Sequence, residues 1–180
     1  MKSWVLGPAA TYFRNAAGFT TFAGSGAATR RVYVAAPASG GSDTNDGLTT
    51  STPVATIAKA KTIIRNGSPD HMLFNKGDSW DETFGASFAF SGKSRNEPML
   101  IGAYGTGARP IIRTGSAQAL GTISSNGKNL AIKGIKFYAD ACDPDSVTFN
   151  GVGGTAATGQ LGGSQNFVWI EDCDMSYSEF

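Results

Sequence analysis

Three side chains near the end of the sequence, Trp169, Glu171 and Asp174, have the chemistry of a carbohydrate site. An indole ring offers a flat apolar face on which a sugar can stack, and carboxylates accept hydrogen bonds from hydroxyl groups. Lys133 and Lys136 fall at matching positions of an earlier segment and would add ammonium groups to the same surface. We expect these five residues to bind a sugar, although a salt-bridged outer surface with Trp169 under a loop would give the same pattern.

A second group of candidate residues is acidic. Asp140, Asp143 and Asp145 lie in the stretch ADACDPDSV. Ca²⁺ takes oxygen ligands, so these three carboxylates could hold a calcium ion. The alternative is a solvated turn around Pro144, because clustered charges in loops are usually hydrated.

The remaining reactive side chains exclude several kinds of chemistry. His71 is the only histidine, so a Ser-His-Asp triad or a histidine-rich metal centre is not expected. Cys142 and Cys173 are too few for a disulfide framework, do not identify a compartment, and need not pair with each other.

The composition favours many short strands joined by tight turns. Glycine supplies 24 of the 180 residues, and phenylalanine supplies 11. Lys and Arg number 15 against 14 Asp and Glu, so there is no basic stripe for nucleic acid. No apolar run approaches the roughly 20 residues of a membrane span, and the N-terminus is a poor signal peptide.

The periodicity predicts one helix followed by strands. After a lead-in over residues 1–30, apolar residues at helical spacing predict a helix over about 56–66, with Thr56 as a candidate N-cap. We find no further helix. Strands are predicted at 31–35, 71–75, 99–104, 110–113, 130–138, 147–149 and 167–175.

An internal repeat decides how these strands are arranged. The segments 130–138 and 168–176 align with their apolar positions matched, and a Gly-rich insertion over about 151–163 separates them. Both copies break their alternation at the same place, Gly134 and Asp172, which predicts two short strands around a corner. A weaker echo aligns 71–78 with 98–105. Repeats of roughly 20–50 residues are typical of solenoids, whose exposed ends need caps, and the predicted helix is suited to that role.

The stretch that leads into the helix resembles a known family. Residues 33–60 are similar to the N-terminal cap of right-handed parallel β-helix proteins of the pectate-lyase-like group. Members show a Tyr-Val strand, a Gly-Ser-Asp-x-Asn-Asp-Gly loop and a Pro-x-x-Thr-Ile-x-x-Ala helix. Here these are Tyr33-Val34, residues 41–47 and residues 53–60.

The resemblance covers about residues 32–178 and implies an all-β fold: a right-handed parallel β-helix (a solenoid) with an N-terminal capping α-helix. Residues 31–180 would be the N-terminal part of that domain, because the chain ends at Phe180, just beyond a strand. Family members usually continue for many more coils and carry their active residues there. No catalytic motif of the family can be placed on this sequence, so the catalytic residues stay unknown.

The resemblance implies a carbohydrate-active protein, lyase-like or glycoside hydrolase-like, that acts on an extracellular polysaccharide. Calcium, which pectate lyases often use to bridge an acidic sugar, is the cofactor that would fit the three aspartates. The alternative is a non-catalytic carbohydrate-binding protein, such as an adhesin or a phage tail-fibre component, because the same cap occurs in enzymes and surface proteins. Either would work outside the cell, at the cell surface or on a virion. The expected partner is a polysaccharide rather than a nucleic acid or a membrane.

Overall fold

The computed structural model describes residues 29–120, 127–149 and 167–176 in full, and outside these ranges only a few short strands. Most of the lead-in expected over 1–30, and most of the insertion expected over 151–163, therefore lie outside the described residues. Within the described part of the chain, no helix is long and apolar enough to cross a membrane.

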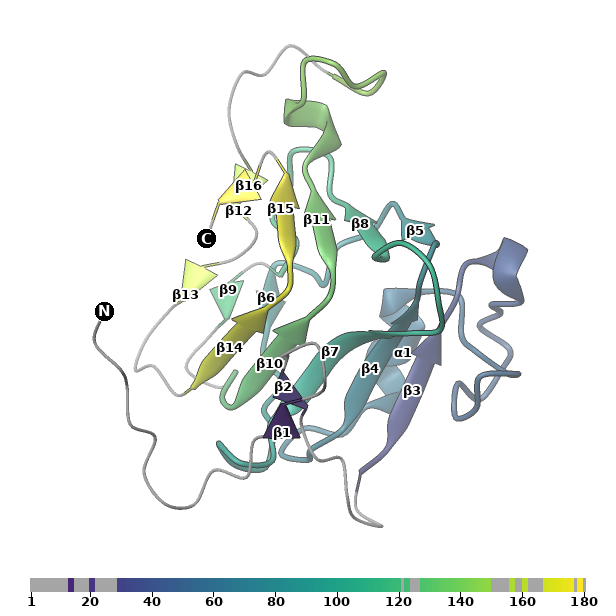
Figure 1. The fold of residues 1–180 in the computed structure, drawn as a ribbon, viewed down its shortest axis with the longest axis vertical. Coiled ribbons are helices and arrows are strands. Elements are labelled where there is room, and N and C mark those ends of the chain that lie inside the picture. The colour runs from purple at the N-terminus through teal and green to yellow at the C-terminus, as the bar shows by residue number, and fades with distance from the viewer. Residues whose placement is uncertain are drawn as a thin grey trace.

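Three sheets of parallel strands form the body of the molecule (Figure 1). The first sheet contains, in spatial order, β14 (Val168–Glu171), β10 (Leu130–Lys133), β7 (Met99–Tyr104), β4 (His71–Asn75) and β3 (Arg31–Val34). The second contains β15 (Asp174–Ser176), β11 (Lys136–Tyr138), β8 (Ile111–Arg113) and β5 (Ser79–Trp80). The third contains β13 (Gln160–Leu161), β9 (Thr122–Ile123) and β6 (Ser87–Phe88).

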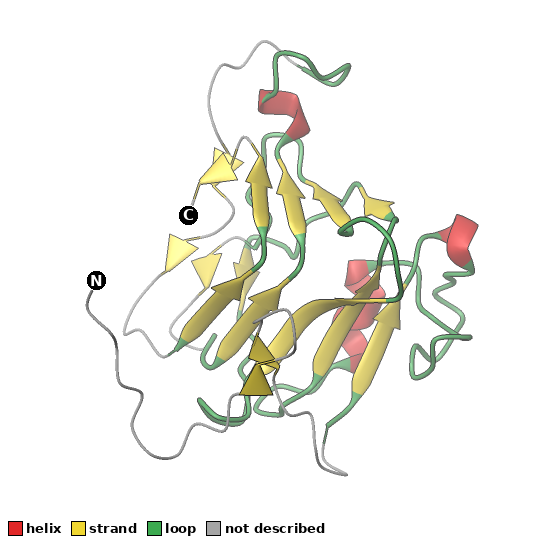
Figure 2. Ribbon diagram, in the orientation of Figure 1, coloured by secondary structure: helices red, strands yellow, loops and turns green. Residues whose placement is uncertain are grey.

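From β4 onward the chain visits these sheets in a fixed order, first, second and third, and then begins a new pass, whereas β3 is followed by the helix α1 (Ile57–Ile63) and then by β4 of the same sheet. The connections from the second sheet to the third lengthen from one pass to the next, and they span residues 81–86, 114–121 and 139–159. Outside the three sheets, β1 (Phe13–Arg14) pairs with β2 (Thr20–Thr21), and β12 (Ala156–Ala157) pairs with β16 (Ser178–Glu179). Figure 2 shows how strands dominate the described chain, which confirms the expected all-β class with parallel strands.

The predicted repeat is confirmed residue by residue. Leu130 pairs with Val168 and Ile132 with Ile170 on the first sheet, while Phe137 pairs with Met175 on the second. The strands are parallel, and the apolar members of each pair stack on the same side because side chains alternate along a strand. Val168, Cys173 and Met175 pack against the core, whereas Ile170 is 37% exposed because β14 is the edge strand of its sheet.

The predicted corner between paired strands lies at Gly134 and Asp172. Their φ angles are 70° and 55°, which is the left-handed region. Glycine adopts it freely, and aspartate is among the few other residues that tolerate it. This turn of the backbone brings Ile135 into the same core as Ile132, although the two residues are an odd number of positions apart.

The weaker echo is wrong in its register. It would place His71 opposite Pro98, but His71 pairs with Leu100. The error is two residues, and a shift of two leaves every side chain on the same face of the strand. Apolar alternation alone therefore cannot distinguish the two registers.

The helix α1 (Ile57–Ile63) begins where expected and ends earlier than the predicted 66. The Thr56 side chain accepts a hydrogen bond from the Lys59 amide at 3.0 Å, which is the predicted N-cap. The buried face of α1 contributes Ile57 and Ala60 to the core, and the helix packs against β3, the edge strand of the first sheet opposite to β14.

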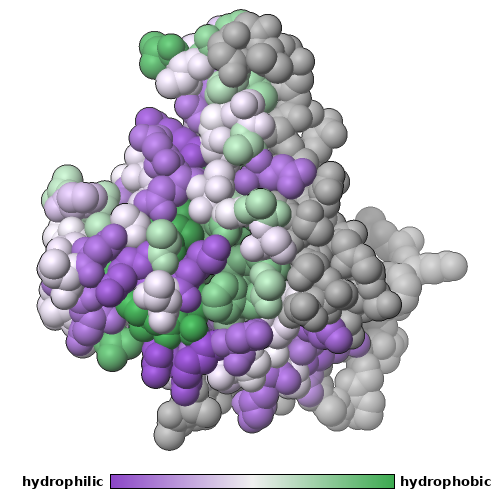
Figure 3. All heavy atoms as spheres, turned by 180° about the vertical axis from the view of Figure 1, so that it is seen from behind, coloured by the Kyte–Doolittle hydropathy of each residue, from purple (hydrophilic) through white to green (hydrophobic). Residues whose placement is uncertain are grey.

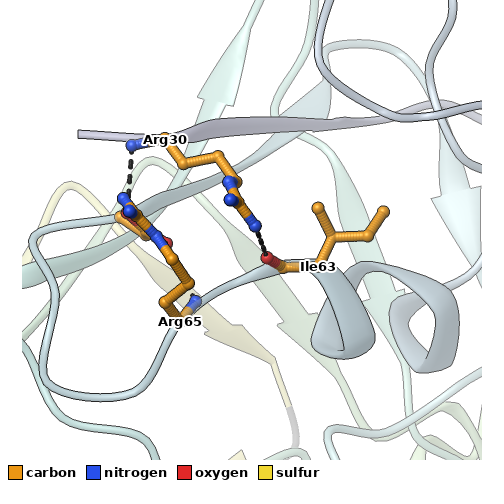
Figure 4. A network of polar contacts seen from close by, with 4 residues as sticks. Arg30, Ile63 and Arg65 are labelled. Atoms are coloured by element: carbon orange, nitrogen blue, oxygen red, sulfur yellow. Dashed lines mark hydrogen bonds and ion pairs between the residues drawn. The ribbon is translucent and has the colours of Figure 1, made fainter. Parts of the chain in front are cut away.

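A buried carboxylate explains where the helix ends (Figure 4). Asp70 is completely buried and accepts hydrogen bonds from the Arg65 amide and side chain and from the Arg30 amide. The Arg65 amide is thereby taken from the helix, while the Arg30 side chain donates to the carbonyl of Ile63 at 2.6 Å. Burial raises the pKa of Asp70, but these donors outweigh it, so that the pKa lies below its ordinary value.

One strand prediction fails. Residues 147–149 form a turn instead of a strand, and the Val147 side chain is fully exposed. Apolar residues there lie on a loop that follows the 3₁₀ turn η2 (Asp140–Cys142) and projects from the top of the molecule (Figure 1), and Figure 3 shows hydrophobic side chains at its tip. The two-residue strands β5 and β6 were not predicted, because two residues carry no periodicity.

Candidate functional site

The outer face of the first sheet carries the candidate site. Ile101 and Ile132 are fully buried in the core, so that their neighbours Gly102 and Lys133 point away from it. Glu171 lies in register with Lys133 on the next strand. The absence of a side chain at Gly102, beside the long cationic side chain of Lys133, leaves a hollow on this face.

That hollow is a pocket of about 430 Å³, which we call the cationic pocket. Glycine and alanine leave the space, and four charged side chains surround it: Lys76, Arg109, Lys133 and Asp172. Three cations against one carboxylate give the lining a formal charge of +2, although the whole chain carries only +1. The full lining is Lys76, Leu100, Gly102, Ala103, Gly107, Ala108, Arg109, Lys133, Gly134 and Asp172.

Arg109 and Asp172 form an ion pair at one side of the cationic pocket. The Arg109 Nε donates to the Asp172 carbonyl oxygen at 3.0 Å, and its Nη2 donates to the Asp172 Oδ1. The hydrogen bond to Asp172 raises the pKa of Arg109, which stays charged. The two side chains are 46% and 26% exposed, so both remain accessible from solvent.

The structure divides the five predicted sugar-binding residues between two sheets. Lys133, Trp169 and Glu171 lie on the first sheet, and the Trp169 Nε1 donates to the Glu171 Oε2 at 3.0 Å. Of these three, only Lys133 lines the cationic pocket. Lys133 and Glu171, which carry opposite charges, lie in register on neighbouring strands.

Lys136 and Asp174 lie on the second sheet, beyond the corner at Gly134 and Asp172. Their side chains form an ion pair at 3.5 Å, and the Lys136 ammonium lies 5.3 Å from the centre of the Tyr138 ring. Because the corner turns the backbone between the sheets, this pair does not join Lys133 in one pocket.

The three aspartates of the predicted calcium site, Asp140, Asp143 and Asp145, do not all face solvent. Asp140 and Asp143 are buried, and each of their oxygens accepts a hydrogen bond. The donors include the Gly115 amide at 3.0 Å and the Tyr138 hydroxyl at 2.6 Å, and the latter bond raises the pKa of Tyr138. Asp145 is exposed. Among the described residues no group of three His, Cys, Asp or Glu is arranged to hold a metal, and calcium binding here stays a prediction.

A second pocket, of about 620 Å³, lies where strands of the second sheet end. It is lined by Asp81, Glu82, Thr83, Arg113, Thr114, Gly115, Asp140, Ala141 and Thr148, and we call it the acidic pocket. Glu82 accepts a hydrogen bond from the Ile57 amide at 3.0 Å, at the start of α1. Burial nevertheless raises the pKa of Glu82 above its ordinary value.

The comparisons with known proteins support the fold. No family model matches the sequence, and no curated protein matches it. Among solved structures, the selenomethionine form of a GH136 lacto-N-biosidase from Eubacterium ramulus is similar, with a TM-score of 0.62 and 17% identity over 81% of this chain. Its native form gives a TM-score of 0.51 with 17% identity over 78% of this chain. A rhamnogalacturonan lyase gives a TM-score of 0.43 with 22% identity over 62% of this chain.

This chain covers only 27% of the lacto-N-biosidase in either form, and 29% of the lyase. At such identities the likeness concerns the path of the backbone and not the residues of a site. The fold of this chain is therefore similar to part of a carbohydrate-active enzyme.

Sequence reasoning did not find Arg109 or Glu82. Arg109 follows a Gly-rich turn and has no partner nearby in sequence, because Asp172 is 63 residues away. Glu82 lies between two short strands that periodicity cannot detect. The register of the repeat could have indicated Arg109, since it places 109, 134 and 172 at one corner.

The two cysteines are not bonded to each other, and burial raises the pKa of Cys173.

Proposed function

We propose that this chain is part of a right-handed parallel β-helix protein that acts on or binds an extracellular acidic polysaccharide, and that the cationic pocket takes one of its acidic sugars. The observation that carries this proposal is the cationic pocket itself, with Lys133 on the outer face of the first sheet and with Lys76 and Arg109 on the adjoining loops. The repeated passes through three parallel sheets, and the likeness to a lacto-N-biosidase, support the fold and the general class.

The chemistry of the pocket suits a sugar carboxylate. A guanidinium group presents two parallel N–H donors to a carboxylate, and an ammonium group adds a point charge. Arg109 and Lys133 offer one of each. Trp169 lies on the neighbouring strand of the same sheet and could stack on an adjacent sugar.

A lyase-like reaction is the catalytic form of this proposal. β-Elimination at a uronate needs a base to remove the proton beside the carboxylate, and cations to stabilise the resulting anion. Lys133 lines the cationic pocket, whereas Lys136 lies on the second sheet outside it, so Lys133 is the better placed of the two predicted amines. The Glu171 and Asp174 pair is a poor choice for hydrolysis, since the two side chains belong to different sheets and do not face each other across one bond.

The test is direct. The purified chain is incubated with polygalacturonate and with alginate, and unsaturated product is followed by its ultraviolet absorbance while binding is measured by calorimetry. We expect binding that weakens with added salt, and at least a tenfold loss of affinity in Arg109→Gln or Lys133→Gln, because a hydrogen bond to a charged group contributes about 1.5 kcal/mol or more. Lys93→Gln is the matched control, because Lys93 forms an exposed ion pair with Glu97 outside the pocket.

The two forms of the proposal differ in the outcome of this assay. Binding with unsaturated product supports a lyase, and binding without turnover supports the alternative, a non-catalytic binding or surface protein. Equal binding of the neutral polymer galactan, or no binding of either acidic polymer, would refute the proposal for the cationic pocket.

The acidic pocket favours glycoside hydrolysis as a second candidate. A hydrolase needs one carboxyl group that is protonated near neutral pH and a second that is ionised. The pKa of Glu82 is raised by burial, and Asp81 and Asp140 line the same pocket. Release of reducing sugar that is abolished in Glu82→Gln and retained in Arg109→Gln would favour this candidate over the first.

A further inference from the structure

The ion pair between Arg109 and Asp172 spans three passes of the chain. The register of the second sheet puts Arg109, Gly134 and Asp172 at the same corner in successive passes. Neighbouring strands are about 4.8 Å apart, so the first and third positions are separated by about 10 Å. The arginine side chain therefore reaches its partner over Gly134. A Cβ atom built at Gly134 has only one neighbour within 4 Å, the Asp172 Oδ2 at 3.9 Å, so the passage is open.

The same ion pair occupies part of the cationic pocket. Nε and Nη2 lie on one edge of the guanidinium, and both donate to Asp172. This edge is one of the two on which a guanidinium can form a paired interaction with a ligand carboxylate or sulfate. The pair is held near the surface, where such contacts contribute about 0.2–1 kcal/mol, so an incoming anion can replace it.

We propose that Asp172 is an internal competitor for the cationic pocket: its carboxylate takes the Arg109 Nη2, and its carbonyl oxygen takes Nε, on an edge of the guanidinium that an anionic ligand would otherwise use, and so sets the affinity and selectivity of the site. For a glycan ligand this rests on the function proposed above. A neutral sugar cannot displace a carboxylate from an arginine, whereas a carboxylate or sulfate group can. Asp172 thereby selects for anions even though it lowers their affinity.

Asp172→Asn isolates this effect. Asparagine also tolerates the left-handed backbone at this corner, where φ is 55°, so that the change removes a charge without new strain. Inorganic sulfate is the probe, titrated at constant ionic strength. We expect its dissociation constant to fall about two- to fivefold, the factor that corresponds to a surface ion pair. Glu97→Gln, which removes a carboxylate from another exposed ion pair, should leave it unchanged.

A double-mutant cycle separates competition from a general change of charge. Removing any carboxylate near the pocket makes its potential more positive, and this effect does not depend on Arg109. Asp172→Asn is therefore also measured in the Arg109→Gln background. Competition predicts that the gain in sulfate affinity disappears there. An equal gain in both backgrounds would overturn the proposal.

A measurement on the unmodified chain keeps the proposal testable if a variant does not fold. Sulfate should shift the Arg109 Nε resonance and the Asp172 carboxyl carbon resonance with one common midpoint, because binding separates the pair. A shift of the Arg109 resonance alone, or of neither resonance, would contradict competition between sulfate and Asp172 for Arg109. If sulfate displaces Asp172 but neither polygalacturonate nor alginate binds, the competitor role of Asp172 is supported and the proposed glycan function is refuted. Failure of one proposal can therefore be distinguished from failure of the other.

Discussion

His71 should make the stability of the fold sensitive to mild acid. The side chain is 6% exposed, on a strand between Arg31 and Leu100. Burial and the charge of Arg31 lower the pKa of His71 from 6.5 to about 4. The folded state thus holds this imidazole neutral in a range of pH where the unfolded chain binds a proton.

The sign and size of the effect follow from this difference. Between pH 6.5 and about 4 the unfolded state binds more protons than the folded state, so the free energy of unfolding falls as the pH falls. The gap corresponds to about 3 kcal/mol at 1.36 kcal/mol per pH unit. Asp70, whose pKa is lowered, loses its contribution only at more acidic pH, below the unfolded value of 3.8. Glu82, whose pKa is raised, acts in the opposite direction over part of the range.

The assay compares the chain with His71→Gln, which does not titrate in this range. Urea unfolding is followed by tryptophan fluorescence at several pH values from about 7.5 to 4. The other groups titrate in both proteins, and the sequence has no second histidine, so the difference between the two curves reports His71. We expect the variant to gain about 3 kcal/mol relative to the parent chain over this range. A difference that stays constant with pH would refute the burial of a neutral imidazole.

Three further substitutions and one control, Val147→Ala, test the fold, each by urea unfolding. Asp70→Ala should cost about 3 kcal/mol, because it removes the buried carboxylate that accepts hydrogen bonds from Arg65 and Arg30; a loss below 1 kcal/mol would contradict that network. Ile135→Ala should cost about 3 kcal/mol by opening a cavity in the core, while Val147→Ala, at a fully exposed site, should cost almost nothing. Gly134→Ala should cost about 1–2 kcal/mol from left-handed strain alone, and an unchanged stability would mean that the corner relaxes.

Those features of the fold that repeat along the chain could be predicted from the sequence. The register of 130–138 on 168–176 followed from matched apolar pairs, and a break at the same place in both copies located the corner at Gly134 and Asp172. A break in alternation at the same place in two aligned copies leaves only one register for the pair of strands. The earlier pair, 71–78 with 98–105, had only alternation to guide it, and alternation is unchanged by a shift of two residues.

The candidate site was predictable only in part. Lys133 could be placed on an outer face by its strand, and the structure puts it in the cationic pocket. Arg109 was not predicted, because its partner lies two passes further along the chain and only the register of the second sheet brings the two positions to one corner. Likewise, no pattern indicates that Asp140 and Asp143 are buried and hydrogen-bonded, because sequence spacing does not reveal which donors a tertiary fold brings near.

The connections from the second sheet to the third differ in length on each pass, whereas the strands that they join keep a strict register. Hydrogen bonding between strands thus fixes the register of the sheets, whatever the length of the connections from the second sheet to the third. Segments could be inserted or exchanged there, and the walls of the acidic pocket reshaped, without displacing the Arg109 and Asp172 corner, since that corner is set by the opposite ends of the second-sheet strands.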